Sequence, residues 1–259
     1  MKRAMNRWRD AAARFAPPVL SFIAGVVAWE LVGRHTNAAF LVPLSETLDR
    51  LWELSQSGEL WEQLASSLAI FVVGFVLALI VGAPGGMLLA RVAVLRRALD
   101  VYITIAYATP LVALIPFILS LMGFGFAPKV LVVFLFAVFP VLYNTVEGAR
   151  SIRPELVEVA RSFQSSETAL WFDVLFPATL PYMMTGFRQA IGRALVGMVA
   201  SEFFLAASGI GELIMVSSRN FDTAALFGTT LTVTVLGVLL MWIGTSLENR
   251  FTVWRGLSR

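Results

Sequence analysis

The chain has 259 residues, of which 58% are apolar and only 14% are charged. An ordinary soluble domain carries about 25% charged residues, and its core could not bury this much apolar surface, so the composition indicates a membrane protein. The net charge of +3 comes from short basic clusters between long apolar runs, which orient membrane helices and argue against nucleic-acid binding. Without cysteine, the chain has no disulfide, thiolate metal site or cysteine nucleophile.

A helix needs about 20 residues to cross the hydrocarbon core, and six apolar segments qualify. They are predicted at residues 17–33, 64–90, 100–122, 129–147, 182–206 and 224–247. The first is expected to begin at Pro17-Pro18, because proline suits the first turn of a helix, and to follow a tail at residues 1–16. No cleavage site follows this segment, so we expect it to be retained. The pattern predicts an all-α protein with one transmembrane domain over residues 1–259.

The distribution of lysine and arginine orients these helices. With the N-terminus in the cytoplasm, the cytoplasmic segments hold 14 basic residues and the external segments hold four. Basic residues are enriched on the cytoplasmic side of membrane proteins. Both termini are therefore expected in the cytoplasm.

Residues 45–62, expected outside the membrane, have the pattern of an amphipathic helix. The apolar residues that recur at helical spacing are Leu48, Leu51, Trp52 and Leu54. Ser45 and Thr47 are both suitable N-caps. We expect this helix to lie on the periplasmic surface.

The third apolar segment contains Pro110 and Pro116, which are expected to break or kink its helix. Carbonyl groups freed at a break are tolerated in a membrane only inside protein or along a cavity. Pro110, together with Thr109 and Met122, is therefore a candidate for the translocation path. The alternative is a kink that serves packing alone.

The fifth apolar segment carries three charged residues, Arg188, Arg193 and Glu202, in a region where charge is costly. Arg188 is near the cytoplasmic end and is expected to snorkel to the surface. Arg193 and Glu202 are nine residues apart, about two and a half turns, so they cannot pair directly. For each of them, an ion pair with another helix and a place in the translocation path are open alternatives. Glu30 is a candidate partner for Arg193.

The long connection at residues 148–181, expected in the cytoplasm, has the pattern of two short amphipathic helices. Pro154 suits the first turn of one of them. Its apolar stripe consists of Leu156, Val159, Ala160 and Phe163. The second is expected at residues 166–175 and to end at Pro177 and Pro181, before the next membrane helix. Apolar faces exposed in the cytoplasm predict a docking surface for another protein.

This connection resembles the signature loop of importer permeases of the ATP-binding-cassette (ABC) class. The signature is Glu-Ala-Ala, three residues, Gly, nine residues, Ile, one residue, Leu-Pro. The corresponding residues here are Glu158-Val159-Ala160, Gln164, Val174 and Phe176-Pro177. Other segments, including WELVG at 29–33 and TPLVALIPFIL at 109–119, are similar to the taurine, aliphatic sulfonate and nitrate permease group. The resemblance covers almost the whole chain and implies a type I ABC importer permease fold in a bacterial inner membrane.

The resemblance also implies which residues couple transport to ATP. They are Glu158, Val159, Ala160, Phe163, Gln164 and Ser165, seated in a groove of a separate ATPase. The chain has no GxxxxGK[ST] motif, so the ATPase must be a partner, present in two copies, and no cofactor is expected. Residues 208–215 (SGIGELIM) resemble the docking region for a substrate-binding protein, with a re-entrant packing element as the alternative.

Further partners are implied by the same family. They are a second copy of the permease, the surrounding lipids, and a periplasmic or lipid-anchored binding protein. The substrate class implied is a small anion such as a sulfonate, nitrate or an aromatic carboxylate.

Two residues depart from the signature. Val159 replaces an alanine, which introduces mild crowding. Gln164 replaces a glycine that suits a turn with positive φ, and keeping that conformation would cost roughly 1 kcal/mol. We therefore expect a slightly rearranged turn at Gln164.

Two other functions fit the sequence less well. A secondary transporter that works without an ATPase would need an ion-coupling site, usually near inverted repeats, and no repeat is evident. An intramembrane enzyme would need a nucleophile and a base, yet the apolar segments contain no cysteine, no histidine and no paired carboxylates. The sequence therefore predicts a transport subunit that is not an enzyme.

Overall fold

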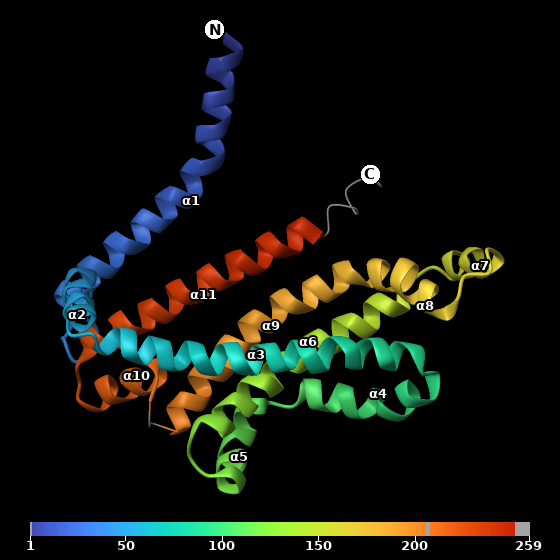
Figure 1. Cartoon of the computed structure of the whole chain (residues 1–259). Coiled ribbons are helices and arrows are strands. Elements are labelled where there is room, and N and C mark those ends of the chain that lie inside the picture. Colours follow the sequence, from blue (N-terminus) through green and yellow to red (C-terminus); the bar gives the residue numbers. More distant parts are fainter. Residues whose placement is uncertain (1, 206–207, 252–259) are drawn as a thin grey trace. The chain divides into compact units, whose positions relative to one another are not determined.

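The structure is a computed structural model that describes residues 2–205 and 208–251, without the side chains of residues 2–15, 93 and 205. In this part of the chain every regular element is helical, which confirms the all-α prediction (Figure 1). In chain order the elements are α1 (Lys2–His35), α2 (Leu44–Gln56), α3 (Glu59–Arg91), α4 (Ala93–Ala108), the 3₁₀ helix η1 (Leu111–Leu114), α5 (Ile115–Met122), α6 (Phe126–Arg150), α7 (Pro154–Ser162), α8 (Glu167–Ala169), the π-helix η2 (Leu170–Leu175), α9 (Phe176–Leu205), α10 (Ile210–Arg219) and α11 (Thr223–Phe251). Arg255 and Arg259, which contribute to the predicted charge asymmetry, lie outside the described residues.

The helices form two compact units. The first contains the chain up to Trp61 and the segment Leu213–Leu231, and the second contains Glu62–Glu212 and the chain from Thr232 on. Helices α3, α10 and α11 each contribute residues to both units. The single transmembrane domain expected over residues 1–259 stays a prediction.

Among the described residues, four helices are long and apolar enough to cross a membrane: α3, α6, α11 and the Ala16–His35 part of α1. The third predicted segment, residues 100–122, is not one helix but a pair, Val94–Ala108 and Leu111–Met122, bent by 89° at a short break. Counted as one span, this pair brings the number to five. α9 has 30 residues but is not among them. A multi-pass membrane protein is thus confirmed, whereas the count of six spans is not reproduced exactly.

The predicted start of the first helix is wrong, because Pro17 and Pro18 lie inside α1 rather than at its beginning. The preceding residues are rich in alanine and arginine, which have high helix propensity, so the helix extends beyond the prolines to Lys2. The predicted tail at residues 1–16 is therefore helical from Lys2 onward.

Neither predicted cap of α2 is used, since the N-cap residue is Pro43. The hydroxyl of Thr47 donates to the Pro43 carbonyl at 3.1 Å. The carboxylate of Glu30 takes the capping role instead, because it accepts the Ser45 N–H at 3.0 Å and the Ser45 hydroxyl at 2.9 Å. Glu30 also pairs with Arg34 at 2.7 Å, so its partners differ from the Arg193 guanidinium suggested by the sequence.

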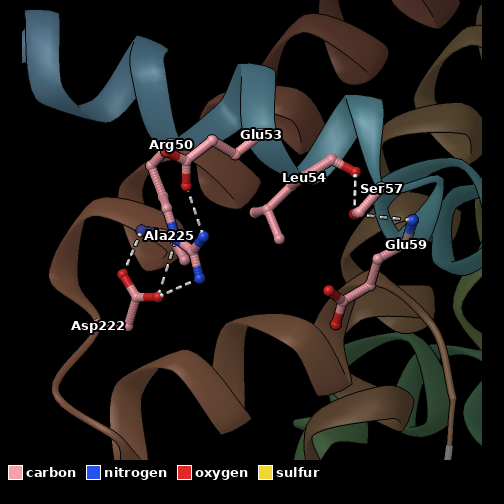
Figure 2. Close-up of polar contacts among 7 residues, drawn as sticks. All are labelled: Arg50, Glu53, Leu54, Ser57, Glu59, Asp222 and Ala225. Carbon is pink, nitrogen blue, oxygen red and sulfur yellow. Dashed lines mark hydrogen bonds and ion pairs between the residues drawn. The ribbon is translucent and has the colours of Figure 1, made fainter.

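In the first unit, Arg50 joins α2 to the start of α11 (Figure 2). Its guanidinium donates to Glu53 at 2.7 Å and to Asp222 at 2.9 and 3.1 Å, and these hydrogen bonds raise the pKa of Arg50. The other carboxylate oxygen of Asp222 accepts the Ala225 N–H at 3.0 Å and so caps α11. The apolar side of α2 packs on this frame through Leu51, Leu54, Leu60, Leu213 and Ala225. The amphipathic helix is confirmed, but it ends at Gln56 and not at residue 62, since α3 begins at Glu59. Its place on the periplasmic surface stays a prediction.

In the second unit, α3, α6 and α9 lie side by side and share the main apolar core (Figure 1). Its most completely buried members include Ile70, Ala78, Val133, Ala137, Ala190, Ala194 and Met198. Helices α3 and α6 approach closely at Gly86, where a Cβ atom would lie 2.6 Å from the Cβ of Thr145. Small residues at helix contacts are typical of membrane proteins. This packed group positions the charged residues of α9 described below.

Candidate functional site

The α7 helix presents an apolar stripe to its surroundings. It begins at Pro154, as predicted, and ends at Ser162. Leu156 is 45% exposed, Val159 is 55% exposed and Phe163, directly after the helix, is 81% exposed. Ala160 lies between them and is half-buried. The described chain therefore leaves the predicted stripe uncovered and accessible to a partner.

The turn after α7 has the glycine-like conformation, so the expectation of a rearranged turn is wrong. Gln164 has a φ of +55°. Its N–H donates to the Arg161 carbonyl at 2.9 Å, and the Ser165 N–H donates to the Ala160 carbonyl at 3.2 Å. This pair of hydrogen bonds is the Schellman motif, which satisfies carbonyl groups at a helix end. The two bonds offset the cost of positive φ at a residue with a side chain.

The second predicted helix exists but does not stop before the membrane segment. It begins after Ser166, whose hydroxyl accepts the Ala169 N–H at 3.2 Å. From Glu167 onward, α8, η2 and α9 form one uninterrupted helical stretch that includes Pro177 and Pro181, so the predicted break is wrong. The wide π turn ends at Leu175, two residues before Pro177, whose missing N–H and bulky ring do not fit an ordinary α turn.

Residues at the end of α3 contact this stretch, which the sequence did not predict. The guanidinium of Arg91 lies 5.3 Å from the centre of the Trp171 ring and 3.8 Å from the Glu167 carboxylate. The carboxylate of Glu167 also lies 3.8 Å from Arg161 of α7. All three charged groups are exposed, so these ion pairs are individually weak. They nevertheless place α7, α8 and α3 in mutual contact.

Glu202 is fully buried near the end of α9 and accepts two hydrogen bonds. One carboxylate oxygen accepts from the Ser67 hydroxyl at 2.6 Å and the other from the Gly211 N–H at 2.8 Å. The Ser67 oxygen in turn accepts the Ile210 N–H at 2.8 Å. The first N–H groups of a helix lack partners within it. Glu202 and Ser67 therefore cap α10 from two other helices, and the negative charge suits that end of the helix dipole.

Hydrogen bonds to side chains of other helices also hold the residues just before α10. The Lys129 ammonium donates to the Ser208 carbonyl at 2.7 Å, and the Gly209 N–H donates to the side-chain oxygen of Gln63 at 2.5 Å. Gly209 has a φ of +106°, and a Cβ atom there would overlap the Glu202 carboxylate. The opposite charges of Lys129 and Glu202 attract within this buried group. We call Gln63, Ser67, Lys129, Glu202 and Ser208–Gly211 the Glu202 cluster.

The sequence left two questions open, namely the role of Glu202 and the role of residues 208–215, and the geometry of the Glu202 cluster addresses both. Its geometry favours a structural role for Glu202, because the carboxylate has no exposed surface. For residues 208–215 it favours a packing element, since Gly209, Ile210 and Gly211 are buried. A translocation role for Glu202 and a docking role for residues 208–215 stay predictions.

Arg188 of α9 has a carboxylate partner. Arg188 does not snorkel freely but pairs with Glu248 of α11 at 2.5 Å, and the Thr185 hydroxyl donates to the same carboxylate at 2.8 Å.

Thr109 and Pro110 lie at the bend between α4 and η1, and Met122 lies at the far end of α5, half-exposed. Their place in a translocation path stays a prediction.

Arg193 is exposed and lies beside a group of aromatic and polar side chains, of which Tyr143 and Gln189 are also exposed. Its guanidinium is 5.3 Å from the centre of the Tyr107 ring. That ring stacks on Tyr143 with centroids 5.5 Å apart and planes inclined by 15°. Beside them, the Asn144 amide donates to the Gln189 side-chain oxygen at 3.2 Å. We call Tyr107, Tyr143, Asn144, Gln189 and Arg193 the Arg193 patch.

No group of three or more histidines, aspartates or glutamates within the described ranges is arranged to hold a metal ion. Lys129, Ser67 and the two tyrosines were missed by the sequence argument. The signal that could have located the first two is the Ser-Gly-Ile-Gly run that follows an intramembrane glutamate, since such a run brings unpaired N–H groups near a carboxylate. Tyr107 and Tyr143 carry no comparable signal, because aromatic residues are common in membrane helices.

Comparison with known proteins places the chain among transport components. Residues 74–253 match the family described as binding-protein-dependent transport system inner membrane component. The chain is 31% identical to the putative aliphatic sulfonates transport permease protein SsuC of Escherichia coli (strain K12), over 98% of this chain and 96% of that one. It is 33% identical to the riboflavin transport system permease protein RibX of Chloroflexus aurantiacus, over 83% and 81% of the two chains.

Two further likenesses extend this comparison. The nitrate import permease protein NrtB of Leptolyngbya laminosa is 28% identical, with 88% of this chain and 84% of that one covered. Among solved structures, the chain is similar to the MetNI methionine ABC transporter in an inward-facing conformation, with a TM-score of 0.61 at 20% identity. That match covers 79% of this chain and 98% of the other, and it shows the fold.

Proposed function

Because the chain belongs to the family of binding-protein-dependent transport system inner membrane components, we propose that two copies of it form the translocation path of an importer for small anions, driven by two ATPase subunits docked on α7. The fold is that of a type I ABC importer permease. The chain is a transport subunit and not an enzyme, and a separate subunit of such importers hydrolyses ATP.

The exposed stripe of α7 is the observation that carries the proposal. Leu156, Val159 and Phe163 leave large apolar side chains uncovered beside charged residues. Apolar surface of this kind at the end of a membrane helix favours a protein partner. The six coupling residues named from the sequence, Glu158 to Ala160 and Phe163 to Ser165, lie on this helix or in the turn that ends it.

Movement of α7 has a direct route into the membrane. The helical stretch from Glu167 through α9 is continuous, and α9 shares its core with α3 and α6. A docked ATPase that shifts on closing around ATP would move α7 and, through this stretch, the helices around Arg193. Such a hinged rigid-body movement converts an inward-open path into an outward-open one.

Several relatives support an anionic substrate. Three of them are named for aliphatic sulfonates, nitrate and taurine, and the strongly basic Arg193 is exposed on α9. Other relatives are named for riboflavin and formylaminopyrimidine. An anionic substrate is therefore a more specific proposal than an importer of small solutes. The distribution of basic residues supports cytoplasmic termini, and the family description supports a binding protein on the opposite side.

The proposal is tested by adding a charge to the stripe. Ala160→Arg places an unpaired guanidinium in the expected contact, and burying such a charge costs several kcal/mol. That is enough to weaken docking by orders of magnitude. The variant should insert and fold normally, but its ATPase should co-purify poorly and ATP hydrolysis stimulated by the binding protein should collapse.

Ser162→Arg is the matched control. It adds the same side chain to the same helix, but about 200° around the axis from Ala160, so docking and hydrolysis should stay near normal. If Ala160→Arg keeps both the ATPase and full uptake, α7 is not the coupling element. Uptake that continues without any bound ATPase would favour the secondary transporter.

A further inference from the structure

We propose that the Arg193 patch is a binding site for one small oxyanion of the sulfonate type, and this inference rests on the proposed function. The patch unites Tyr107 of α4, Tyr143 and Asn144 of α6, and Gln189 and Arg193 of α9. The family comparison assigns none of these five residues. Tyr143, Gln189 and Arg193 are exposed, and Tyr107 and Asn144 are half-buried beside them.

The charge of Arg193 is available to a ligand. No ion pair joins it to a carboxylate in the part of the chain that the structure describes, and its side chain is exposed. The other charged groups of α9 have polar partners: Arg188 pairs with Glu248, and Glu202 accepts hydrogen bonds from Ser67 and Gly211. A cation held in a membrane helix without a carboxylate partner is costly, which marks it as functional.

The groups around Arg193 suit an oxyanion. A cation–π contact with Tyr107 steadies the guanidinium and does not use its N–H donors. Those donors form a planar fork that matches two oxygens of a sulfonate or carboxylate. The stacked Tyr107–Tyr143 pair offers an apolar surface for a short organic tail. The amides of Asn144 and Gln189 add neutral polar groups beside it.

The depth of Arg193 favours a solute over a lipid headgroup. It lies seventeen residues after Phe176 and twelve before Leu205, the ends of α9. At 1.5 Å per residue, the nearer end is about 18 Å away, whereas half of the hydrocarbon core is about 15 Å. The sequence predicts that this part of α9 spans the membrane, which places a phospholipid headgroup about a half-membrane away and favours the translocated solute as the occupant.

The test measures ethanesulfonate binding to the full-length permease with its ATPase in phosphatidylcholine nanodiscs, by saturation-transfer NMR. Ethyl methyl sulfone serves as the uncharged analogue. We expect ethanesulfonate alone to bind, Arg193→Gln to weaken its binding about tenfold or more, and Arg193→Lys to weaken it less. Arg250→Gln, which removes an exposed charge at the end of α11, should bind as the unchanged protein does.

Several outcomes would overturn the site. These are equal binding by Arg193→Gln, equal binding of the neutral sulfone, no binding at all, and loss of the assembled complex in Arg193→Gln. Displacement of ethanesulfonate by phosphatidylglycerol in the nanodisc would assign Arg193 to a headgroup instead. Ala160→Arg separates the two proposals, because it should lose the ATPase yet keep the anion site, so either can fail alone.

Discussion

Gln164 holds a backbone conformation that favours glycine, with a φ of +55°. A side chain in this region costs about 1 kcal/mol, so Gln164→Gly should stabilise the folded permease by about that amount. Gln164→Ala removes the side chain but keeps the Cβ atom, and it should not stabilise. Thermal unfolding in detergent compares the two variants. Equal stability of the glycine and alanine variants would show that this turn is not strained.

The Glu202 cluster should respond as one unit. Glu202→Gln places an amide N–H against either the Ser67 hydroxyl or the Gly211 N–H, which both donate to the carboxylate. Ser67→Ala removes the hydroxyl that donates to Glu202 and accepts the Ile210 N–H. Each should cost about 1–3 kcal/mol. Because the residues share a network, their effects should be non-additive by about 0.5 kcal/mol or more in a double-mutant cycle followed by thermal unfolding.

Ser201→Ala provides the control for this cycle. Its hydroxyl bonds the Met198 carbonyl within α9 rather than the cluster, so its effect should add simply to that of Ser67→Ala. Simple addition of Glu202→Gln and Ser67→Ala would contradict the network.

At the residue scale, the sequence located the costly charges but not their partners. Arg193 and Glu202 stand out because charge is rare in membrane helices. Tyr107, Ser67 and Lys129 lie on other helices, far away in the sequence, and only helix packing brings them to these charges. Glu30 was the wrong partner for Arg193 for the same reason, since it is used by Arg34 and Ser45 within its own unit.

The continuous helical stretch from Glu167 into α9 is the main feature at the element scale. If it transmits movement, flexibility placed before α9 should separate docking from transport. Val174→Gly with Leu175→Gly should weaken the helix by about 2 kcal/mol. We expect normal co-purification of the ATPase but less substrate imported per ATP hydrolysed.

The matched control is Val174→Ala with Leu175→Ala, which removes the same side chains but preserves helix propensity. It should keep near-normal coupling. Equal coupling ratios in the glycine and alanine pairs would show that movement does not pass through this stretch.

Element positions followed from the sequence better than element boundaries did. The amphipathic helix α2 and the apolar stripe of α7 were predicted from periodicity. The boundaries at Pro17 and Pro177 were wrong, because local composition and a π turn carry a helix through a proline. The bend at Pro110 was anticipated as a break or kink, but its 89° angle depends on packing that the sequence does not reveal.

At the scale of the whole molecule, apolar composition and the signature loop were sufficient to predict an importer permease, and the family match confirms this. The number of spans was harder to predict, since one predicted segment is a pair of helices bent by 89°, and α9, which carries three charged residues, is not among the helices long and apolar enough to cross a membrane. In the assembled transporter, we expect the ATPase to dock on the exposed stripe of α7.

Photo-crosslinking detects this docking in the membrane. A benzophenone amino acid replaces Phe163, which is 81% exposed, and in a separate variant replaces Trp52 of α2, which is 66% exposed. In membranes that contain the assembled transporter, position 163 should cross-link to the ATPase subunit in high yield, and position 52 should not. Absence of the ATPase from the products at position 163, with the complex intact, would show that the ATPase does not dock on the stripe of α7.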